Sequence, residues 1–370
     1  MRILVLNGGS STFKCWYGTL PSDTPHPEWE KKIEWSSQAG QPDLDPLLKS
    51  LDKPVDAIGH RIVHGGKAYR DSTRITPDVR KAIAEQVEFA PSHNRLELEA
   101  IQSADRVFGP DMPQVAVFDT QFHATLEPAA YVYAGPYEWL EKGVRRYGFH
   151  GISHQYASRR AAQILNRKLE GLRIITCHLG NGASLAAIRD GRSIDTTMGF
   201  TPLEGLMMGT RSGSIDPGII IYLVRHRGYD AADLDRILNQ RSGLSGISGI
   251  SGDMREILAA IQKGNERAKL AYGIYLHRLC QEIGAMLGSL GGLDVLVFTA
   301  GVGENCVPLR ADVARQFAFL GLELDEAKNN NSPVDEDIST TTSKIRTLVI
   351  HAEEDWQIAR ECYKVLSNGH

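Results

Sequence analysis

The chain has 370 residues, of which 42% are hydrophobic, so it can form roughly two or three domains with apolar cores. Its formal net charge of −4 and sequence pI of about 6.3, without any Lys- and Arg-rich run, argue against nucleic acid as a principal partner. Its five scattered cysteines include no CxxC pair, which argues against a zinc ribbon and favours a reducing compartment.

The N-terminal residues lack the basic segment and the long apolar run of a signal peptide. A membrane-spanning helix needs about 18 consecutive apolar residues, and the sequence contains no such stretch. We therefore expect a cytoplasmic protein that has no membrane among its partners.

The first element expected is a short strand that ends in a turn of small residues. Ile3–Leu6 is an apolar run, Asn7–Thr12 contains only small or polar side chains, and Phe13–Tyr17 follows as a second strand. Backbone N–H groups in such a turn can approach an anion, because no bulky side chain covers them. An ordinary hairpin is the other interpretation of this segment.

Two more strands are expected in the first third of the chain, and each ends beside residues that could carry chemistry. Val55–Gly59 leads into a glycine-containing segment with Arg61, and Val115–Phe118 is followed directly by Asp119. A helix is expected between them, because Thr76–Pro77 provides a cap and a first-turn proline.

Two pairs of histidines are spaced four residues apart, His60 with His64 and His150 with His154. On a helix this spacing would align both side chains for a metal ion. Glycines lie inside or beside both pairs, however, and no HExxH motif occurs. We therefore expect solvated or hydrogen-bonding histidines rather than a zinc site.

The order of strand and glycine turn returns about half a chain later. Arg173–Cys177 leads into His178–Ser184 and then Leu185–Ile188, and Val295–Ala300 leads into Gly301–Asn305. This repetition predicts two related domains that face each other across a cleft. None of the turns matches GxxxxGK[ST] or GxGxxG, so neither a P-loop nor a dinucleotide-binding fold is expected.

The stretch Asp195–Pro217 combines apolar, hydroxyl-bearing and glycine residues with a single cation, Arg211. Gly209, Ser212 and Gly213 surround that arginine with little bulk, which suits bidentate contact with a carboxylate or phosphate. A loop arginine that pairs with a nearby acid is the alternative interpretation.

Two later segments also have two interpretations each. Ser242–Gly252 is rich in Gly and Ser and is either a loop that contacts a ligand or a connector between helices. Glu353, Glu354 and Asp355 lie where a strand is followed by a helix, and they form either a solvated turn or a magnesium site.

Glycine-rich turns in repeated modules, arginines at the ends of elements and isolated acids at strand ends together suit phosphoryl transfer. In that reaction positioning and charge neutralisation provide most of the catalysis, and little covalent chemistry is asked of the protein. The residues concerned are Asn7, Arg61, Asp119, Arg211 and Glu354.

Seven ordered segments resemble the acetate kinase family, part of the acetate and sugar kinase/Hsp70/actin superfamily, and the resemblance extends over nearly the whole chain. Seven segments in one order are far more specific than any one of them. The segments are Leu6–Lys14, Gly59–Gly66, Val117–His123, Tyr147–His154, His178–Gly182, Thr197–Pro217 and Phe298–Asn305.

The resemblance implies an α/β fold with duplicated actin-like (ribonuclease H-like) domains, in which mixed sheets are flanked by helices and the active-site cleft lies between the domains. The N-terminal domain, 1–122 plus 356–370, would form the acyl-substrate side, and the C-terminal domain, 123–355, would bind nucleotide and form a homodimer. The implied reaction is direct in-line phosphoryl transfer between ATP and a short carboxylate such as acetate, giving an acyl phosphate and ADP. Magnesium, or manganese in its place, is the implied metal.

The resemblance also implies roles for single residues. Arg61 and Arg211 would hold the substrate carboxylate and the migrating phosphoryl group, and His150 would donate toward the equatorial oxygens of that group. Asp119 matches the residue taken as catalytic acid or base, but a carboxylate nucleophile has no proton to lose at neutral pH. We expect Asp119 to orient Arg61 or the metal instead.

Asn7 and Glu354 match the residues linked to the metal in the family. The second assignment depends on the alignment, because the family's usual Asn-Glu-Glu reads Glu-Glu-Asp here. Aligning Ile358–Ala359 selects Glu354, whereas a slip of one residue would select Glu353 or Asp355.

Two further sets of residues follow from the resemblance. The small apolar pocket for the acyl methyl group would consist of Val63, Ser92, Phe149 and Pro202. The nucleotide and its phosphates would be contacted by Ser10, Ser11, Thr12, Lys14, His178, Leu179, Gly180, Asn181, Gly182, Asp253, Met254, Arg255, Gly301, Val302, Gly303, Glu304 and Asn305.

Three departures from the family pattern bear on specificity. Ser92 stands in place of a pocket leucine, Arg95 in place of a common proline and Ile152 in place of a common threonine. Ser92 removes apolar bulk, so we expect acids longer than acetate to be tolerated, with a graded preference because a methylene misfit costs about 1–3 kcal/mol. A propionate or butyrate kinase, or a pyrophosphate-forming relative, is the nearest alternative. A slow nucleotide-binding switch of the same superfamily is the alternative from another class.

Overall fold

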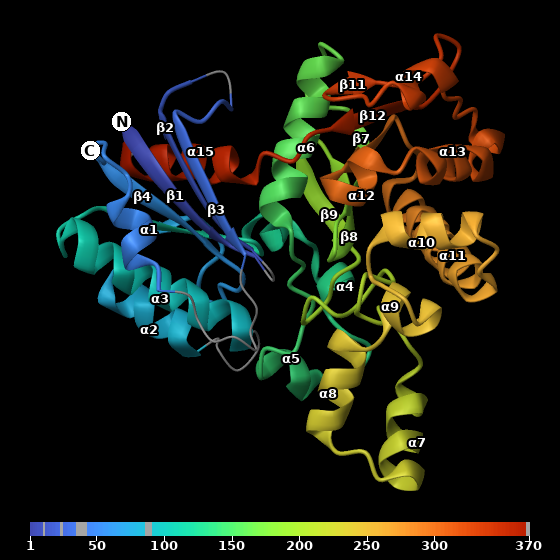
Figure 1. Ribbon diagram of the computed structural model, residues 1–370, viewed down its shortest axis with the longest axis horizontal. Helices are drawn as coiled ribbons and strands as arrows, with labels where there is room; N and C mark the ends of the chain where they lie inside the picture. Colours follow the sequence, from blue (N-terminus) through green and yellow to red (C-terminus); the bar gives the residue numbers. More distant parts are fainter. Residues whose placement is uncertain (10–11, 23–24, 35–42, 86–90, 368–370) are drawn as a thin grey trace. The chain divides into compact units, whose positions relative to one another are not determined.

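The computed structural model describes residues 1–9, 12–22, 25–34, 43–85 and 91–367, apart from the side chains of residues 91–94. The backbone divides into two compact units, which are described one after the other (Figure 1). Unit 1 consists of Met1–Ala124, His150–Tyr156 and Glu353–His370, and unit 2 consists of Thr125–Phe149 and Ala157–Ala352. The division of function between a substrate domain and a nucleotide domain stays a prediction.

Unit 1 contains a six-stranded mixed sheet with the strand order β3-β2-β1-β4-β6-β5. Its strands are β1 (Arg2–Gly8), β2 (Thr12–Thr19), β3 (Trp29–Glu34), β4 (Ala57–Ile62), β5 (Thr73–Arg74) and β6 (Gln114–Phe118). β2 pairs antiparallel with both β1 and β3. β1, β4 and β6 run parallel to one another, and β5 is antiparallel to β6. In this register Asn7 lies opposite Lys14, beside the first hairpin turn.

Helices cover both faces of the sheet of unit 1. They are α1 (Asp45–Lys49), α2 (Pro77–Glu85), α3 (Pro91–Phe108) and α15 (Glu354–Ser367). α15 contacts β1, β4 and β6, and a Cβ atom at Gly59 would lie 3.0 Å from Ile358 of that helix. Its neighbour Ile58 faces the opposite way, toward α1 and α3, as alternate residues of a strand do. Because both faces are buried, the middle of β1, Ile3–Leu6, is an uninterrupted apolar run.

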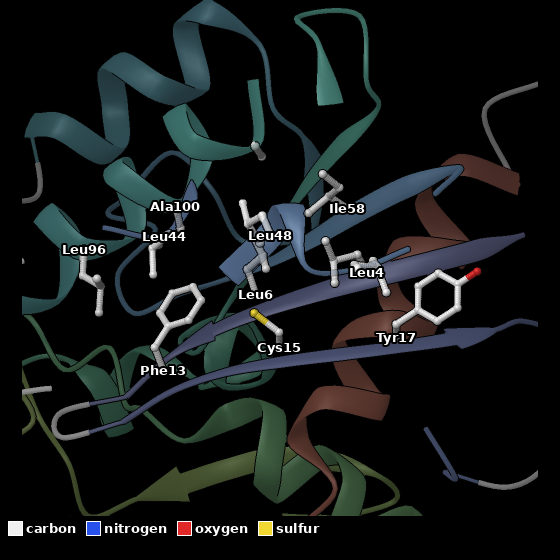
Figure 2. Packing of buried hydrophobic residues seen from close by; sticks show 12 residues of the cluster. Leu4, Leu6, Phe13, Cys15, Tyr17, Leu44, Leu48, Ile58, Leu96 and Ala100 are labelled. Atoms are coloured by element: carbon white, nitrogen blue, oxygen red, sulfur yellow. The ribbon is translucent and has the colours of Figure 1, made fainter. Parts of the chain in front are cut away.

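The core between this sheet and α1 and α3 is a closely packed apolar cluster. Figure 2 shows Leu6, Phe13, Leu44 and Leu96 among its members, and at most 1% of each is exposed. Each such side chain stabilises the fold by about 1.5–3 kcal/mol through burial. This cluster fixes β1, β2 and α3. Asn7 lies on β1 and Lys14 on β2.

Unit 2 contains a second six-stranded sheet, with the order β9-β8-β7-β10-β12-β11. Its strands are β7 (Arg173–Leu179), β8 (Ala183–Arg189), β9 (Arg192–Thr196), β10 (Val295–Thr299), β11 (Glu336–Asp337) and β12 (Arg346–Ile350). The first three are antiparallel, β7, β10 and β12 run parallel, and β11 is antiparallel to β12.

The two sheets therefore have the same topology. Their strands match in spatial order, in direction and in sequence along the chain, from β1 with β7 to β6 with β12. The repetition predicted from the strand and glycine-turn segments is confirmed, and with it the α/β class with duplicated mixed sheets flanked by helices.

The other helices belong to unit 2, except that α6 begins in unit 1. They are α4 (Pro128–Tyr131), α5 (Tyr137–Glu141), α6 (Gly151–Ile164), α7 (Pro217–Arg227), α8 (Ala231–Gln240), α9 (Gly243–Ser248), α10 (Met254–Gln262), α11 (Glu266–Leu290), α12 (Ala300–Asn305), α13 (Val307–Gln316) and α14 (Glu326–Asn330). Short 3-10 helices lie at Gln121–Thr125 and Ala318–Leu320. Across the described residues, no helix is long and apolar enough to cross a membrane.

The long helix α11 illustrates how the sequence determines these elements. Its buried residues recur every three or four positions, as an amphipathic helix requires, and they pack against β7, β8, β9 and α13. The Asn265 side chain caps its start by accepting the Ala268 N–H, and Gly291 ends it with a φ of 66°.

Two glycine-containing segments differ from what their composition suggests. Gly301–Asn305 is part of helix α12 rather than a turn, because the chain changes direction one residue earlier, at Ala300, whose φ is 64°. Ser242–Gly252 contains the short helix α9. In α9, the Leu244 and Ser245 N–H groups donate to the carbonyls of Met208 and Gly209, and these bonds offset the low helix propensity of glycine.

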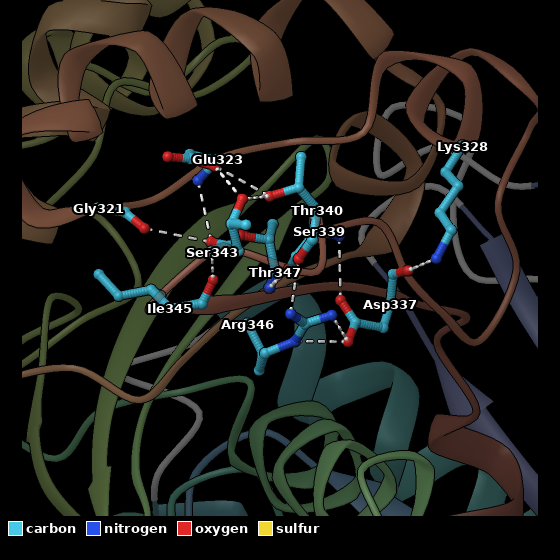
Figure 3. A network of polar contacts seen from close by, with 11 residues as sticks. Gly321, Glu323, Lys328, Asp337, Ser339, Thr340, Ser343, Ile345, Arg346 and Thr347 are labelled. Carbon is cyan, nitrogen blue, oxygen red and sulfur yellow. Dashed lines mark hydrogen bonds and ion pairs between the residues drawn. The ribbon is translucent and has the colours of Figure 1, made fainter.

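A polar network fixes the segment that leads into β12 (Figure 3). Arg346 Nε donates to Asp337 Oδ2 at 2.7 Å, and Ser343 Oγ donates to the Ile345 carbonyl at 2.6 Å. The Thr342 hydroxyl donates to the Glu323 carboxylate at 2.7 Å. The first bond joins β11 to β12, and the other two hold the segment that precedes β12.

Candidate active site

The charged cluster of unit 1 lies at the carboxyl ends of its parallel strands. Arg61 is the last residue but one of β4, and Asp119 directly follows β6, the neighbouring strand. Parallel neighbours end at the same edge of a sheet, so the two side chains meet there. Asp119 Oδ2 accepts hydrogen bonds from Arg61 Nη2 at 2.6 Å and from Arg61 Nε at 3.2 Å. Only 11% of the Arg61 side chain and 2% of the Asp119 side chain are exposed.

Asn7 extends this cluster to β1 and α15. Arg61 Nη1 donates to the Gly8 carbonyl at 3.2 Å and to Asn7 Oδ1 at 3.5 Å. The Asn7 amide in turn donates to Asp355 Oδ1 at 2.5 Å, in the first turn of α15. A carboxylate is favoured there because the first turn of a helix has a positive potential. Asp119, Arg61, Asn7 and Asp355 thus form one connected polar chain.

Burial and neighbouring charges act in opposite directions on the titratable groups of this cluster. Burial raises the pKa of Asp119, and the charge and hydrogen bonds of Arg61 oppose that rise. Burial also raises the pKa of Asp355, against the charge of Lys14 and the hydrogen bond from Asn7. Burial disfavours the charge of Arg61, but the Asp119 carboxylate outweighs this effect and the pKa of the guanidinium is raised.

Glu354, the first residue of α15, interacts electrostatically with both Arg61 and Asp119. The side chains of Glu354 and Asn7, both in unit 1, have oxygen atoms that can act as metal ligands. Among the residues that the structure describes, no group of three or more His, Cys, Asp or Glu side chains is arranged to hold a metal ion. Magnesium needs no such group, because it usually binds through one or two carboxylates and completes its coordination with phosphate oxygens and water. The donor set therefore fits magnesium.

His150 is positioned beside the cluster by the backbone around Asp119. It lies directly before α6 and has a φ of 55°, an uncommon value for a residue other than glycine. The Asp119 carboxylate accepts the backbone N–H of His150, and the Asp119 carbonyl accepts the Gly151 N–H at 2.8 Å. A Cβ atom at Gly151 would lie 2.2 Å from that carbonyl oxygen, so this approach requires glycine.

Glu97 of α3 is a residue near this cluster that sequence reasoning missed. It is only 3% exposed, and its Oε1 atom accepts the backbone N–H of Val63 at 2.8 Å. Burial raises the pKa of Glu97 to about 8, against the opposing effects of that hydrogen bond and of Arg61. The apolar periodicity over residues 96–104 puts position 97 on the buried face of the helix, which is the signal that could have found it.

In unit 2 the central stretch, Asp195–Pro217, packs against the turn Gly180–Gly182 and against α9. The Gly209 N–H donates to the Asn181 carbonyl at 3.1 Å, and the Ser245 N–H donates to the Gly209 carbonyl at 2.9 Å. At the start of α9, Gly243 has a φ of 63°, and a Cβ atom there would lie 2.3 Å from the Met208 carbonyl oxygen. Three glycine-containing segments that are distant in sequence therefore form one packed group.

Arg211 belongs to this packed group. Its Nη1 atom donates to the Pro202 carbonyl at 3.1 Å, and its own carbonyl accepts the Met208 N–H at 3.1 Å. The side chain is half-buried. Both the guanidinium and the backbone of Arg211 are therefore held by residues of the same stretch.

Arg310 of α13, which sequence reasoning also missed, fixes the end of α12. The residue is fully buried, and its guanidinium donates to the carbonyl oxygens of Gly303 at 2.9 Å and Glu304 at 2.7 Å. It also donates to the side chain of Asn329 at 2.7 Å and to its carbonyl at 3.0 Å. Burial lowers the pKa of the guanidinium. No local sequence signal distinguishes this arginine from the exposed ones.

The carboxylate of Glu304 joins α12 to the residues that follow β12. One oxygen accepts the Ala352 N–H at 3.0 Å, and the other lies 2.6 Å from His351 Nδ1. Earlier in the chain, Asp253 caps α10 by accepting the Arg255 N–H at 2.8 Å and pairs with the exposed Arg255 side chain at 2.6 Å.

The predicted site residues thus form two groups. Unit 1 brings together Asn7, Arg61, Asp119, His150 and Glu354, and it also contains Thr12 and Lys14 on β2 and the buried Val63. Unit 2 contains His178 and Leu179 at the end of β7, the turn Gly180–Gly182, Pro202, Arg211, Met254, α12 and the buried Phe149. The joint roles of residues from different units stay predictions. Ser10, Ser11 and the side chain of Ser92 lie outside the described residues.

Known proteins resemble this chain over nearly its whole length. The family model described as the Acetokinase family matches residues 42–360. The acetate kinase of Gloeobacter violaceus is 54% identical over 403 aligned residues, which cover 99% of this chain and 100% of the relative. The crystal structure of Porphyromonas gingivalis acetate kinase matches with a TM-score of 0.87 and 38% identity, over 99% of both chains. A propionate kinase from Francisella tularensis matches with a TM-score of 0.85 and 37% identity, over 97% of this chain and 98% of its own.

Proposed function

Since this chain belongs to the Acetokinase family, we propose that it transfers the terminal phosphoryl group of ATP to acetate in one in-line step, at the charged cluster of unit 1. Its class of activity is ATP-dependent phosphoryl transfer to a carboxyl acceptor, as in the acetate kinases that it resembles. The residue assignments and the course of the reaction are the substance of the proposal.

The observation that carries the proposal is the anchored guanidinium of Arg61. An arginine has five N–H donors, and Asp119, Gly8 and Asn7 accept four hydrogen bonds from it, one of them long at 3.5 Å. Counting bonds to the described residues, one donor on Nη2 and the weakly engaged donor on Nη1 are left for the two oxygens of a substrate carboxylate. Asp119 fixes the guanidinium on its other edge, so little order has to be gained when acetate binds.

Acetate enters this reaction as its own nucleophile. A carboxylate is ionised at neutral pH, so no base has to remove a proton from it. We therefore assign Asp119 to holding Arg61 and not to acid–base catalysis. In-line transfer then depends on alignment of the attacking and leaving oxygens and on neutralising the charge between them.

The remaining residues of the proposed mechanism neutralise that charge. His150 donates toward the equatorial oxygens of the phosphoryl group, and Arg211 pairs with the same group from the central stretch. The oxygen donors of Asn7 and Glu354 would hold magnesium, which when bound shields the phosphate charges of ATP. The hairpin turn Gly180–Gly182 and α12 contact the nucleotide.

The first test measures acyl phosphate formation, trapped with hydroxylamine, from ATP and magnesium with acetate, propionate, butyrate or no acid. Acetate dominance is the expected result. A preference for propionate or butyrate would move the preferred substrate toward the alternative that Ser92 suggests. No product with any acid would contradict the proposal.

The second test separates a kinase from a nucleotide-binding switch. Arg211→Ala is expected to lower kcat by roughly 100-fold or more while ADP binding persists, because one donor to a transition-state charge is worth about that much. Arg236→Ala is the matched control, since its side chain is 55% exposed on α8. Equal kcat values for the two variants would favour the switch.

We also propose that the chain forms a homodimer through α7. This helix buries none of its residues, yet Ile219, Ile221, Tyr222 and Val224 are each between 45% and 50% exposed. A soluble surface rarely presents so many apolar side chains on one helix without a partner. Light scattering should show a dimer that Ile221→Asp dissociates.

Val334→Asp is the control for this variant, because Val334 is 67% exposed in a separate segment and its change should leave the dimer intact. A monomeric wild-type protein would contradict the proposed dimer.

A further inference from the structure

Glu97 has a role in the site that the proposed mechanism does not assign. Its carboxyl group is buried on α3, and its Oε1 atom accepts the backbone N–H of Val63, two residues after Arg61. Its Oε2 atom is equally buried and has no hydrogen-bond partner among the residues that the structure describes. An ionised carboxylate in such a position would keep one oxygen desolvated and unpaired. The geometry therefore favours the protonated acid.

Two charged groups of the cluster act on this carboxyl. Arg61 favours its ionised form and Asp119 disfavours it, so the two largely oppose one another. Burial is the largest effect, and it raises the pKa of Glu97 to about 8. Near neutral pH the group is thus neutral, and it becomes an anion in the mildly alkaline range.

We propose that Glu97 is a positioning residue that permits acetate binding only while it carries a proton. The charges of Arg61 and Asp119 cancel, so a neutral Glu97 leaves the acetate site without net charge from these three groups. Loss of the proton adds one negative charge close to Arg61, which repels the acetate anion and competes for the guanidinium. This inference rests on the proposed role of Arg61 in binding the substrate carboxylate.

The main experiment compares the KM for acetate of the wild-type protein and Glu97→Gln between pH 6.5 and 9.5. Glutamine keeps an oxygen for the Val63 N–H but cannot ionise. The wild-type KM should rise above pH 8, at most about tenfold per pH unit for a single ionisation, and the KM of Glu97→Gln should stay level. The KM for ATP should be the same in both proteins.

Glu99→Gln is the matched control on the same helix, because Glu99 is partly exposed and pairs with Arg106. It should retain the wild-type rise in KM. Parallel KM profiles for the wild-type protein and Glu97→Gln would overturn the proposal.

Thermal unfolding gives a second readout that does not depend on activity. Between about pH 4.5 and 8 the folded state retains a proton on Glu97 that the unfolded state has lost, so the contribution of Glu97 to wild-type stability falls as the pH rises. The difference in Tm between Glu97→Gln and the wild type should therefore grow over this range and level off above pH 8. A constant difference in Tm would contradict the proposal that Glu97 is protonated in the folded state. An absence of acetyl phosphate formation in all proteins would instead contradict the proposed function.

Discussion

The residues that directly follow corresponding strands form different pairs in the two copies of the fold. In unit 1, Asp119 directly follows β6 and binds Arg61, and the side chains are 2% and 11% exposed. In unit 2, His351 directly follows β12 and lies against Glu304, and the side chains are 54% and 14% exposed. The strand topology is the same, so burial is what distinguishes them. The buried pair holds its charges against little screening, whereas water reaches the second pair.

The units also differ in which parts of the chain they organise. Unit 1 arranges side-chain charges around Arg61, and unit 2 arranges backbone segments, through Gly209, Gly243 and the carbonyl contacts of Arg310. A duplicated fold can thus supply charge in one copy and shape in the other.

The largest expected effect comes from breaking the buried pair. Asp119→Ala leaves Arg61 charged and buried without its partner, which should cost about 3–5 kcal/mol of unfolding free energy. It should also lower kcat/KM for acetate roughly 100-fold, because the guanidinium loses its orientation. Urea unfolding and steady-state kinetics measure both effects.

Asp56→Ala is the control, since the pair of Asp56 with Arg2 is 38% and 42% exposed and should contribute only about 0–1 kcal/mol. Similar losses in the two variants would show that burial does not separate these pairs.

Arg310→Met tests the backbone arrangement of unit 2. The change preserves an apolar stem but removes the hydrogen bonds that Arg310 donates to the carbonyl oxygens of Gly303, Glu304 and Asn329, which should cost about 3 kcal/mol in total. The KM for ATP should rise while the KM for acetate stays near its original value. Arg315→Met on the same helix is the control, because that side chain is 72% exposed.

The third prediction concerns the effect of acid on stability, through two buried histidines of unit 1. Burial lowers the pKa of both His60 and His64 to about 4. Between pH 6.5 and 4 the unfolded chain therefore binds two protons that the folded chain does not bind. Stability should therefore fall as the pH falls through this range. Each histidine contributes about 1.4 kcal/mol per pH unit, and the proton held by Glu97 offsets one of the two.

The measurement is the unfolding free energy in urea from pH 6.5 to 4.5. His60→Gln removes one of the two protons and should change the slope by about 1.4 kcal/mol per pH unit, whatever its effect on overall stability. An unchanged slope would mean that His60 is not protonated on unfolding.

The smallest effect is expected at the exposed pair of unit 2. His351→Asn should lower the unfolding free energy by less than about 1 kcal/mol, because water screens the pair and Glu304 keeps its bond to the Ala352 N–H. Urea unfolding beside Asp119→Ala provides the comparison. A loss as large as that of Asp119→Ala would contradict the distinction drawn from burial.

The sequence allowed the duplicated sheets to be predicted, because strand and turn are local properties that recur with the same residue types. The contact of Asp119 with Arg61 was one of two roles expected for Asp119 after the family resemblance, the other being a contact with the metal. It did not reveal that α12 is a helix, because the turn at Ala300 depends on where β10 directs the chain.

Periodicity could have placed Glu97 on the buried face of α3, but the contacts of Glu97 and Arg310 could not be predicted from the sequence. Their roles arise from burial against segments that are distant in sequence, such as Val63 for Glu97 and Asn329 for Arg310. The φ of His150 is likewise imposed by the Asp119 backbone and not by local preference. Charges that are inside a fold and charges that are on its surface look alike in a sequence.

The position of α15 has a consequence for the synthesis of the chain. This helix covers one face of β1, β4 and β6, and Asn7 binds Asp355 across 348 residues of sequence. All of Thr125–Phe149 and Ala157–Ala352, which form unit 2, is translated before α15 emerges from the ribosome. The unit that is begun first is therefore completed last, and its uncovered sheet face is available to chaperones throughout translation.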